Sequence, residues 1–134
     1  MFRAFVVIML TIAMSSCAVF SAKAPPEDID KAAGLFVKRL NAQDYEKIYE
    51  DAARKFKTAK TKSEIVENLK ALAEHGAVLD HRRTSMSFAG EGSDMIAQPV
   101  YSSRFEKGSG DLLLSFVDEG GEWKLFGFSL KVRG

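Results

Sequence analysis

The sequence predicts an α+β domain in which three N-terminal helices pack on one face of a curved, four-stranded antiparallel sheet. Apolar residues recur at helical spacing between residues 29 and 73, and the apolar period changes to two after Gly76. Short glycine-bearing turns separate the later segments, which is typical of antiparallel hairpins that follow one another along the chain. Because the helices come first and the strands follow, we expect the helices to be segregated onto one sheet face.

The first helix is predicted to begin near Pro26, because proline fits the first helical turn. The acidic residues Glu27, Asp28 and Asp30 complement the positive end of the helix dipole. One continuous apolar stripe follows at helical spacing, and it consists of Ile29, Ala32, Ala33, Phe36, Val37 and Leu40.

A second helix is predicted after Asp44, a plausible N-cap residue, with an apolar stripe from Tyr45 to Phe56. The third helix starts at a capping box, in which Thr61 and Glu64 stand three residues apart before an apolar pattern. Its stripe consists of Ile65, Leu69, Leu72 and Ala73. It ends at His75 and Gly76, where the glycine can adopt the left-handed conformation.

Four strands are predicted after the helices, over residues 78–88, 95–105, 112–117 and 123–132. Glycine-containing turns join them at residues 90–93, 107–110 and 118–121. Pro99 falls within the second strand and cannot donate a ladder hydrogen bond, so we expect it at a bulge or at an edge-facing position.

The N-terminal segment has the features of an export signal. Arg3 precedes an apolar run over residues 4–14, which is shorter than the roughly 20 residues of a bilayer-spanning helix. Small residues then lead to Cys17, the only cysteine in the chain. This segment resembles a bacterial lipoprotein signal peptide, whose lipobox corresponds here to Met14-Ser15-Ser16-Cys17, with Met14 in place of the usual leucine.

The resemblance implies that residues 1–16 are removed as a signal peptide and that Cys17 carries a diacylglycerol thioether and an amide-linked acyl chain such as palmitate. Residues 17–26 would then be the lipidated cysteine and a short tether, and residues 27–134 the folded domain. Ala18 is not the aspartate associated with inner-membrane retention, which favours the periplasmic face of the outer membrane. A lone cysteine cannot form an intramolecular disulfide, and two or more acyl chains anchor a protein stably. An unmodified cysteine after an ordinary signal peptide and an uncleaved N-terminal anchor are the alternatives.

Charge argues against a nucleic-acid partner. The chain has 19 basic and 18 acidic residues, and removal of residues 1–16 takes away Arg3 alone, which leaves 18 of each. A neutral domain has no global field that attracts nucleic acid. Locally, basic side chains gather in one cluster that is either a solvated face or a contact with anionic lipid or an acidic partner: Arg54, Lys55, Lys57, Lys60 and Lys62.

The C-terminal sequence carries a second resemblance. The order of elements and the segment GGEWKLFGF at residues 120–128 resemble the cystatin-like superfamily, which includes nuclear transport factor 2-like proteins, over roughly residues 27–132. The chain is also similar to small bacterial lipoproteins with an uncharacterised domain of that fold. The resemblance implies a cone-shaped space between the curved sheet and the helices.

In ketosteroid isomerase-like and polyketide cyclase-like members of the superfamily, the cone holds an aspartate or histidine base together with a tyrosine or a protonated acid. Such a base needs a mostly apolar pocket that shifts its pKa towards the working pH. The candidates here are Asp80, His81 and Tyr101, with Tyr45 or Tyr49 as further tyrosines. The catalytic pattern of the family does not map onto them residue by residue.

Other chemical signatures point away from a metal or a cofactor. The sequence has no phosphate-binding glycine loop, no zinc-protease motif and no nucleophile elbow. His75 and His81 are six residues apart across a predicted helix end, which is poor spacing for a shared metal. We therefore expect neither a metal nor a cofactor.

The function expected from the sequence is that of a membrane-anchored, non-enzymatic module that binds a protein partner or a small apolar ligand at the cell envelope. The alternative is a small isomerase-like or cyclase-like enzyme that uses a polar residue in the cone. An open apolar cavity containing Asp80, His81 or Tyr101 would favour a ligand or catalysis. A cone filled by Phe36, Phe126 and Phe128 would favour an interaction module.

Overall fold

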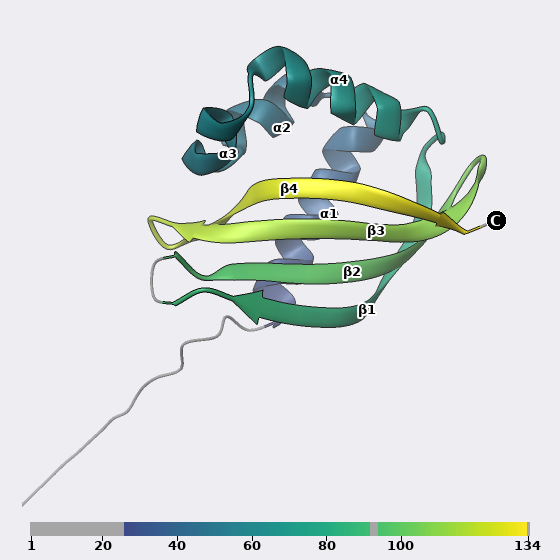
Figure 1. Ribbon diagram of the computed structural model, residues 1–134. Coiled ribbons are helices and arrows are strands. Elements are labelled where there is room, and N and C mark those ends of the chain that lie inside the picture. Colours follow the sequence, from purple (N-terminus) through teal and green to yellow (C-terminus); the bar gives the residue numbers. More distant parts are fainter. Residues whose placement is uncertain (1–25, 92–93, 134) are drawn as a thin grey trace, which may run out of the picture.

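The computed structural model describes residues 26–91 and 94–133, and this part of the chain contains four helices followed by four strands (Figure 1). The helices are α1 (Pro26–Asn41), α2 (Tyr45–Asp51), α3 (Arg54–Ala59) and α4 (Lys62–Ala73). The strands are β1 (Val78–Ala89), β2 (Ile96–Phe105), β3 (Gly108–Glu119) and β4 (Glu122–Arg133). The predicted signal peptide, Cys17 and the tether before Pro26 lie outside the described residues.

Helix α1 starts at Pro26 as predicted, with Glu27 and Asp28 in its first turn. The helix crosses one face of the sheet, so that its beginning lies beside β1 and its later turns lie beside β4 (Figure 1). The predicted stripe is the buried side of the helix, since Ile29, Ala33 and Leu40 are at most 2% exposed.

The single helix predicted over residues 45–56 is wrong, because the structure has two helices there. Asp44 caps α2 by accepting a hydrogen bond from the backbone N–H of Lys47, as predicted. Ala52 and Ala53 then adopt extended conformations, with ψ values of 161° and 143°. The N–H of Ala53 donates to the carbonyl oxygen of Leu125 at 2.8 Å. This bond to β4 takes the place of a helical bond, so the helix is interrupted and restarts at Arg54.

Helix α4 begins and ends as its sequence signals predict. Thr61 and Glu64 form the reciprocal capping box, in which each side chain accepts a hydrogen bond from the other residue's backbone N–H. Gly76 has a positive φ of 86°. A Cβ at this position would lie 2.7 Å from the Cβ of Glu106, so both backbone conformation and space require glycine.

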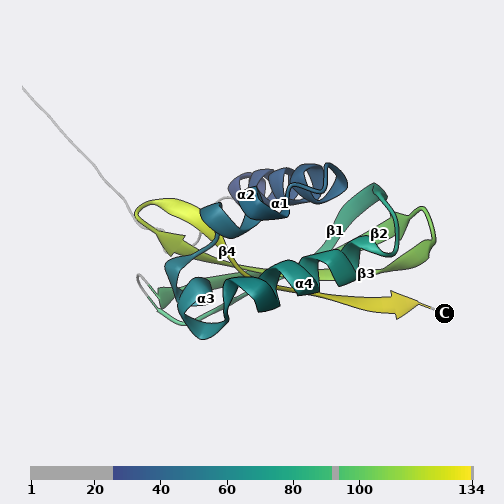
Figure 2. The same cartoon turned by 90° about the horizontal axis from the view of Figure 1, so that it is seen from above.

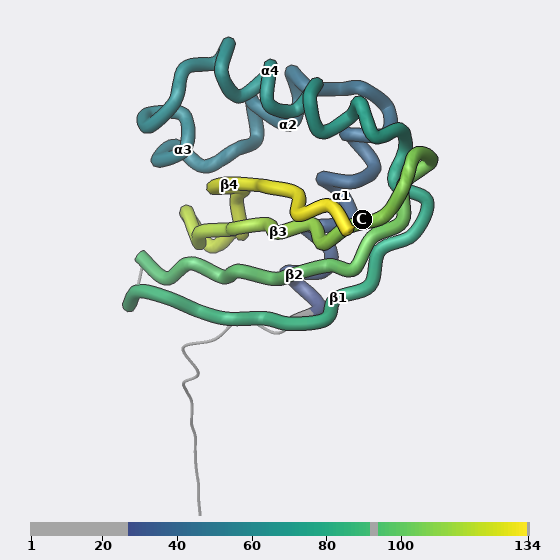
Figure 3. The backbone as a smooth tube through the Cα atoms, turned by 45° about the vertical axis from the view of Figure 1, so that its right-hand side comes forward, coloured from purple at the N-terminus to yellow at the C-terminus, as the bar shows by residue number. Residues whose placement is uncertain are grey.

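The four strands form one antiparallel sheet in the order β1-β2-β3-β4, as the hairpin turns predict. Register shifts interrupt the β1–β2 pairing twice, after Val78 and after Arg83, and the β3–β4 pairing once, after Ser115. Such irregularities increase strand twist and bending. The sheet is accordingly curved, and its strands bend together at the end that lies nearest the C-terminus (Figure 3).

Two details of the sheet differ from the prediction. Strand β3 starts at Gly108 and not at Leu112, so the expected turn over residues 107–110 is largely strand. Gly110 allows this close pairing, because a Cβ there would lie 2.8 Å from the carbonyl oxygen of Lys131. Pro99 is buried in an interior strand, neither on an edge nor at a register shift. It is one of the two β2 residues between Ala97 and Val100 that have no paired partner on β3.

The core lies between the helices and one face of the sheet, which confirms the predicted fold class. Helices α1 and α2 lie on one side of the sheet, and α3 and α4 run along its β4 edge (Figure 2). On β2 and β3 the buried positions alternate, and they include Tyr101, Phe105, Leu112, Leu114 and Phe116. The opposite face of the sheet carries the half-buried and exposed positions of the same two strands.

Candidate functional site

Of the candidates Asp80, His81 and Tyr101, two lie together on the helix-facing side of the sheet. The rings of His81 and Tyr101 meet edge to face with their centroids 5.6 Å apart. Asp80 is the neighbour of His81 in an extended strand and therefore points to the other sheet face, where it is exposed. The structure thus separates Asp80 from His81 and Tyr101.

The group that faces Tyr101 is Asp30 of α1, which sequence reasoning assigned only to the helix dipole. The Tyr101 hydroxyl donates to Oδ1 of Asp30 at 2.7 Å. The Nε of Arg83 donates to the same oxygen at 3.0 Å and forms an ion pair with it. The three side chains join α1 to β1 and β2.

Burial is the main cause that raises the pKa of Tyr101 far above its usual value, and the hydrogen bond and negative charge of Asp30 raise it further. Tyr101 is only 2% exposed. A proton donor or acceptor in catalysis works best when its pKa lies near the operating pH. The phenol is therefore held neutral as a hydrogen-bond donor, and its geometry suits attachment of α1 to the sheet.

The remaining tyrosine candidates lie elsewhere. The ring of Tyr49 lies beneath two ammonium groups, with Nζ of Lys57 at 5.5 Å and Nζ of Lys62 at 5.6 Å from its centroid. Tyr45 is half-buried and packs against the core. Neither residue joins His81 and Tyr101, so the five candidates do not form one site.

Aromatic rings fill the space between the helices and the sheet. Phe36 of α1 lies 5.8 Å from Phe128 of β4, measured between ring centroids. Phe56 of α3 meets Phe126 and Phe128 edge to face at 6.5 and 6.2 Å. These distances are typical of packed aromatic pairs. The three phenylalanines named in the sequence prediction therefore contribute to a filled interior, to which Phe56 adds a fourth ring.

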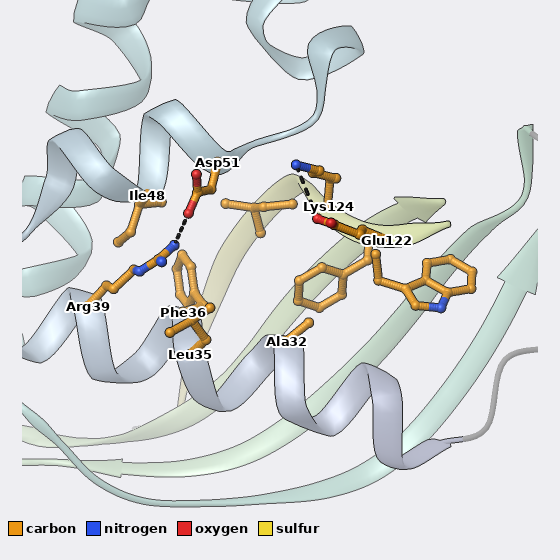
Figure 4. Close-up of a pocket in the computed structure, with 11 residues that line it drawn as sticks. Ala32, Leu35, Phe36, Arg39, Ile48, Asp51, Glu122 and Lys124 are labelled. Carbon is orange, nitrogen blue, oxygen red and sulfur yellow. Dashed lines mark ion pairs between the residues drawn. The ribbon is translucent and has the colours of Figure 1, made fainter. Parts of the chain in front are cut away.

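A hollow beside this cluster opens between α1, α2 and the start of β4 (Figure 4). Its volume is about 230 Å³, which is below the roughly 300–1,000 Å³ of ordinary small-molecule sites. An ion pair between Arg39 and Asp51, at 2.7 Å, lies at one end, and Glu122 and Lys124 lie at the other (Figure 4). Leu35, 45% exposed, forms part of its rim.

The predicted basic cluster is interleaved with acceptors. Lys55 forms an ion pair with Asp94 at 2.6 Å, and Lys62 forms one with Glu46 at 2.7 Å. The hydrogen bond that Lys62 donates to the Glu46 carboxylate also raises the pKa of Lys62. Lys57 donates to the backbone carbonyl of Glu50 at 3.0 Å. This arrangement favours the solvated-face interpretation over a dedicated lipid contact.

Glu119 is a structural residue that the sequence did not reveal. Its carboxylate accepts the backbone N–H groups of Arg54 and Lys55 at 3.0 and 3.4 Å. These are the first donors of α3, whose own N-cap residue Ala53 offers no side-chain acceptor. The bond from Arg54 lowers the pKa of Glu119. No local signal could have revealed it, because Glu119 is more than sixty residues away in the sequence.

The described residues contain neither a candidate metal cluster nor a candidate membrane-spanning helix. Among them, no cluster of three or more histidine, cysteine or acidic side chains has an arrangement that could hold a metal ion. Within the same part of the chain, no helix combines the length and apolar character that a membrane crossing requires.

Comparison with known proteins relates the chain to others by structure alone. The sequence matches no known family and no curated protein. Among solved structures, the chain is similar to a protein of unknown function with a cystatin-like fold from Nostoc punctiforme, with a TM-score of 0.56 and 16% identity, over 81% of this chain and 90% of the other. It is also similar to Bdellovibrio bacteriovorus Bd1075, with a TM-score of 0.52 and 12% identity, over 81% of this chain and 40% of the other. At these identities the likeness supports the fold, which is cystatin-like.

Proposed function

We propose that the chain is a bacterial envelope lipoprotein, anchored through acyl chains on Cys17, whose cystatin-like domain binds a protein partner and catalyses no reaction. The single observation that carries the binding role is the filled interior. Phe36, Phe56, Phe126 and Phe128 pack against one another where a ligand-binding member of this fold would keep a cavity, and the hollows that remain beside them, of about 230, 240 and 270 Å³, are each smaller than an ordinary ligand site. A domain closed inside recognises other molecules through its surface.

The enzymatic alternative has weaker support. It needs a substrate to reach Tyr101 or His81, and the Tyr101 hydroxyl is buried and donates to Asp30. A small apolar ligand in the hollow beside Leu35 also has weaker support, because that hollow is smaller than ordinary ligand sites.

The anchor is tested by metabolic labelling with an alkyne fatty acid, followed by fractionation of membranes. The wild-type chain should carry label and sediment with membranes, and Cys17→Ser should carry none. Equal labelling of the two forms, or label in neither, would contradict the proposed lipidation.

The partner is tested with a photo-crosslinking amino acid in living bacteria. It is placed at Leu35, Gln98 or Asn68, three side chains that are exposed on different parts of the domain. One position should give an adduct of discrete mass that is lost in Cys17→Ser, because the unanchored chain no longer meets its partner. Adducts that are unchanged without the anchor would argue against an envelope partner.

A further inference from the structure

The β4 edge of the sheet borders a groove. Strand β4 is the last strand of the sheet, and no strand within residues 26–91 and 94–133 pairs with its outer edge. Two hollows of about 270 and 240 Å³ lie between this strand and the helices α3 and α4, and they share Asn68 and Phe128. We call the two together the β4 groove. Apart from the shared pair, its lining includes Phe56, Ala59, Lys60, Ala71, His75, Phe126 and Leu130.

The shape of the β4 groove suits a linear chain. Phe126 and Phe128 line one hollow, and Phe128 and Leu130 line the other. The apolar side chains thus recur at every second residue, which is about 7 Å along a strand and equals the repeat of an extended peptide. Each hollow is smaller than the roughly 300 Å³ at which small-molecule sites begin. Each has room for one side chain of a ligand that continues into the next hollow.

The chain itself already uses this edge. The extended segment at Ala52 and Ala53 donates one backbone hydrogen bond to the carbonyl oxygen of Leu125. Leu125 directly precedes the residues that line the β4 groove. Beyond it, an edge strand presents further backbone N–H and C=O groups that an added strand can pair with. The link between α2 and α3 makes one such backbone bond to β4. A bound peptide can make further bonds to the β4 residues that follow Leu125.

Charge indicates the kind of peptide. Among the described residues that line the β4 groove, the ionisable ones are Lys60, in the hollow that Phe126 lines, and His75, in the hollow that Leu130 lines. Lys60 carries a positive charge, the His75 imidazole supplies an N–H that can donate to a carboxylate, and no carboxylate of the described residues lines either hollow. The electrostatic complement is a segment with acidic residues at its ends.

We propose that the β4 groove binds an extended, acidic-ended segment of the protein partner, which pairs with β4 as a fifth strand and places apolar side chains in the two hollows. This is peptide recognition by strand addition, in which backbone bonds give affinity and alternate side chains give specificity. The proposal rests on the proposed function and specifies the surface and the chemistry of its partner.

The test uses the full chain in lipid nanodiscs and a labelled peptide, acetyl-Asp-Leu-Thr-Leu-Thr-Leu-Asp-amide, with binding followed by fluorescence anisotropy. Two further peptides carry N-methyl groups on alternate residues, one on the odd and one on the even set. Only one edge of an added strand pairs with β4, so one methylated set should weaken binding about tenfold or more and the other should leave it nearly unchanged. Equal effects of the two sets would overturn strand addition.

Variants locate the site. Asn68→Phe fills the shared part of the β4 groove and should abolish binding. Glu67→Phe, at the preceding residue of α4 and outside the lining, should preserve it. Lys60→Glu should weaken the acidic peptide several-fold and strengthen a version with lysine at both ends. Unchanged binding by Asn68→Phe, or no binding by the folded wild-type chain at millimolar peptide, would overturn the proposal.

Two other outcomes separate this proposal from the proposed function. If the peptide fails to bind while a crosslinker elsewhere on the domain still gives an anchor-dependent adduct, the β4 groove is not the binding surface and the envelope role stands. If sedimentation shows a dimer that the peptide does not dissociate and that Asn68→Phe disrupts, a second copy occupies the β4 groove and the proposal fails.

Discussion

The hydroxyl of Tyr101 lies 2.7 Å from Oδ1 of Asp30, although the two residues are 71 positions apart in the chain. The bond links the second turn of α1 to the middle of β2, inside the layer between helix and sheet. Arg83 donates to the same oxygen and neutralises its charge. The buried phenol and the ion pair together fix where α1 crosses the sheet.

Removal of the Tyr101 hydroxyl should destabilise the domain. We expect Tyr101→Phe to lower the free energy of unfolding by about 1–2 kcal/mol, because it removes a hydrogen bond to a charged acceptor. Urea denaturation followed by circular dichroism gives the value. Tyr45→Phe is the matched control, since the Tyr45 hydroxyl makes no hydrogen bond within the described residues. An equal loss in both variants would contradict a specific role of the Tyr101 bond.

Alkaline pH should remove the same contribution. The folded state raises the pKa of Tyr101 above its ordinary value of 10.0. The folded state therefore retains a proton that the unfolded chain loses, so this stabilisation is complete below about pH 10 and declines as the pH rises further. The difference in unfolding free energy between wild type and Tyr101→Phe should shrink from about pH 8 to about pH 11. A constant difference would be inconsistent with the raised pKa.

Glu119 should control the start of α3. Glu119→Ala leaves the backbone N–H groups of Arg54 and Lys55 without their acceptor, and we expect a loss of about 1 kcal/mol, as for the loss of a helix cap. Amide hydrogen exchange should accelerate at residues 54–57 and remain unchanged in α4. Glu122→Ala, which removes a carboxylate near the same turn, is the control. Comparable exchange rates in the two variants would refute capping by Glu119.

Phe36 should be among the most sensitive positions of the interior. It is 4% exposed, and Phe36→Ala should cost about 3–5 kcal/mol, because it removes a large buried ring and leaves a cavity. The neighbouring Leu35 is 45% exposed, and Leu35→Ala should cost much less. Thermal denaturation of the two variants provides the comparison. A small effect at Phe36 would mean that the space between helices and sheet is not tightly filled.

The sequence predicts those features whose causes are local. The capping box at Thr61 and Glu64, the left-handed Gly76 and the hairpin order each depend on residues within a few positions, and each is confirmed. The break between α2 and α3 is different, because the acceptors that cause it belong to Leu125 and Glu119. A helical stripe that continues through Ala52 and Ala53 contains no sign of these distant groups.

The face of β4 to which a side chain points also depends on pairing with a distant strand, which the local sequence pattern does not reveal. Alternation predicts that Leu125 and Phe128 point to opposite faces of the last strand. The register shift after Ser115 pairs Leu125 with Phe116 and Phe128 with Leu114, which lie on one face of β3. For the candidate site, the sequence supplies Tyr101 and His81 but not Asp30. Asp30 follows the buried Ile29 at the start of a helix, where an acid is already explained by the helix dipole.

The path of α1 across the sheet has a consequence for orientation. The chain enters the domain beside β1, whereas the β4 groove lies on the opposite border, about three strand spacings or roughly 14 Å away (Figure 1). Under the proposed lipidation of Cys17, the short tether would hold the β1 border toward the bilayer. The opposite border, which carries the β4 groove, would then point away from the membrane into the periplasm. A periplasmic partner could bind there without contacting lipid.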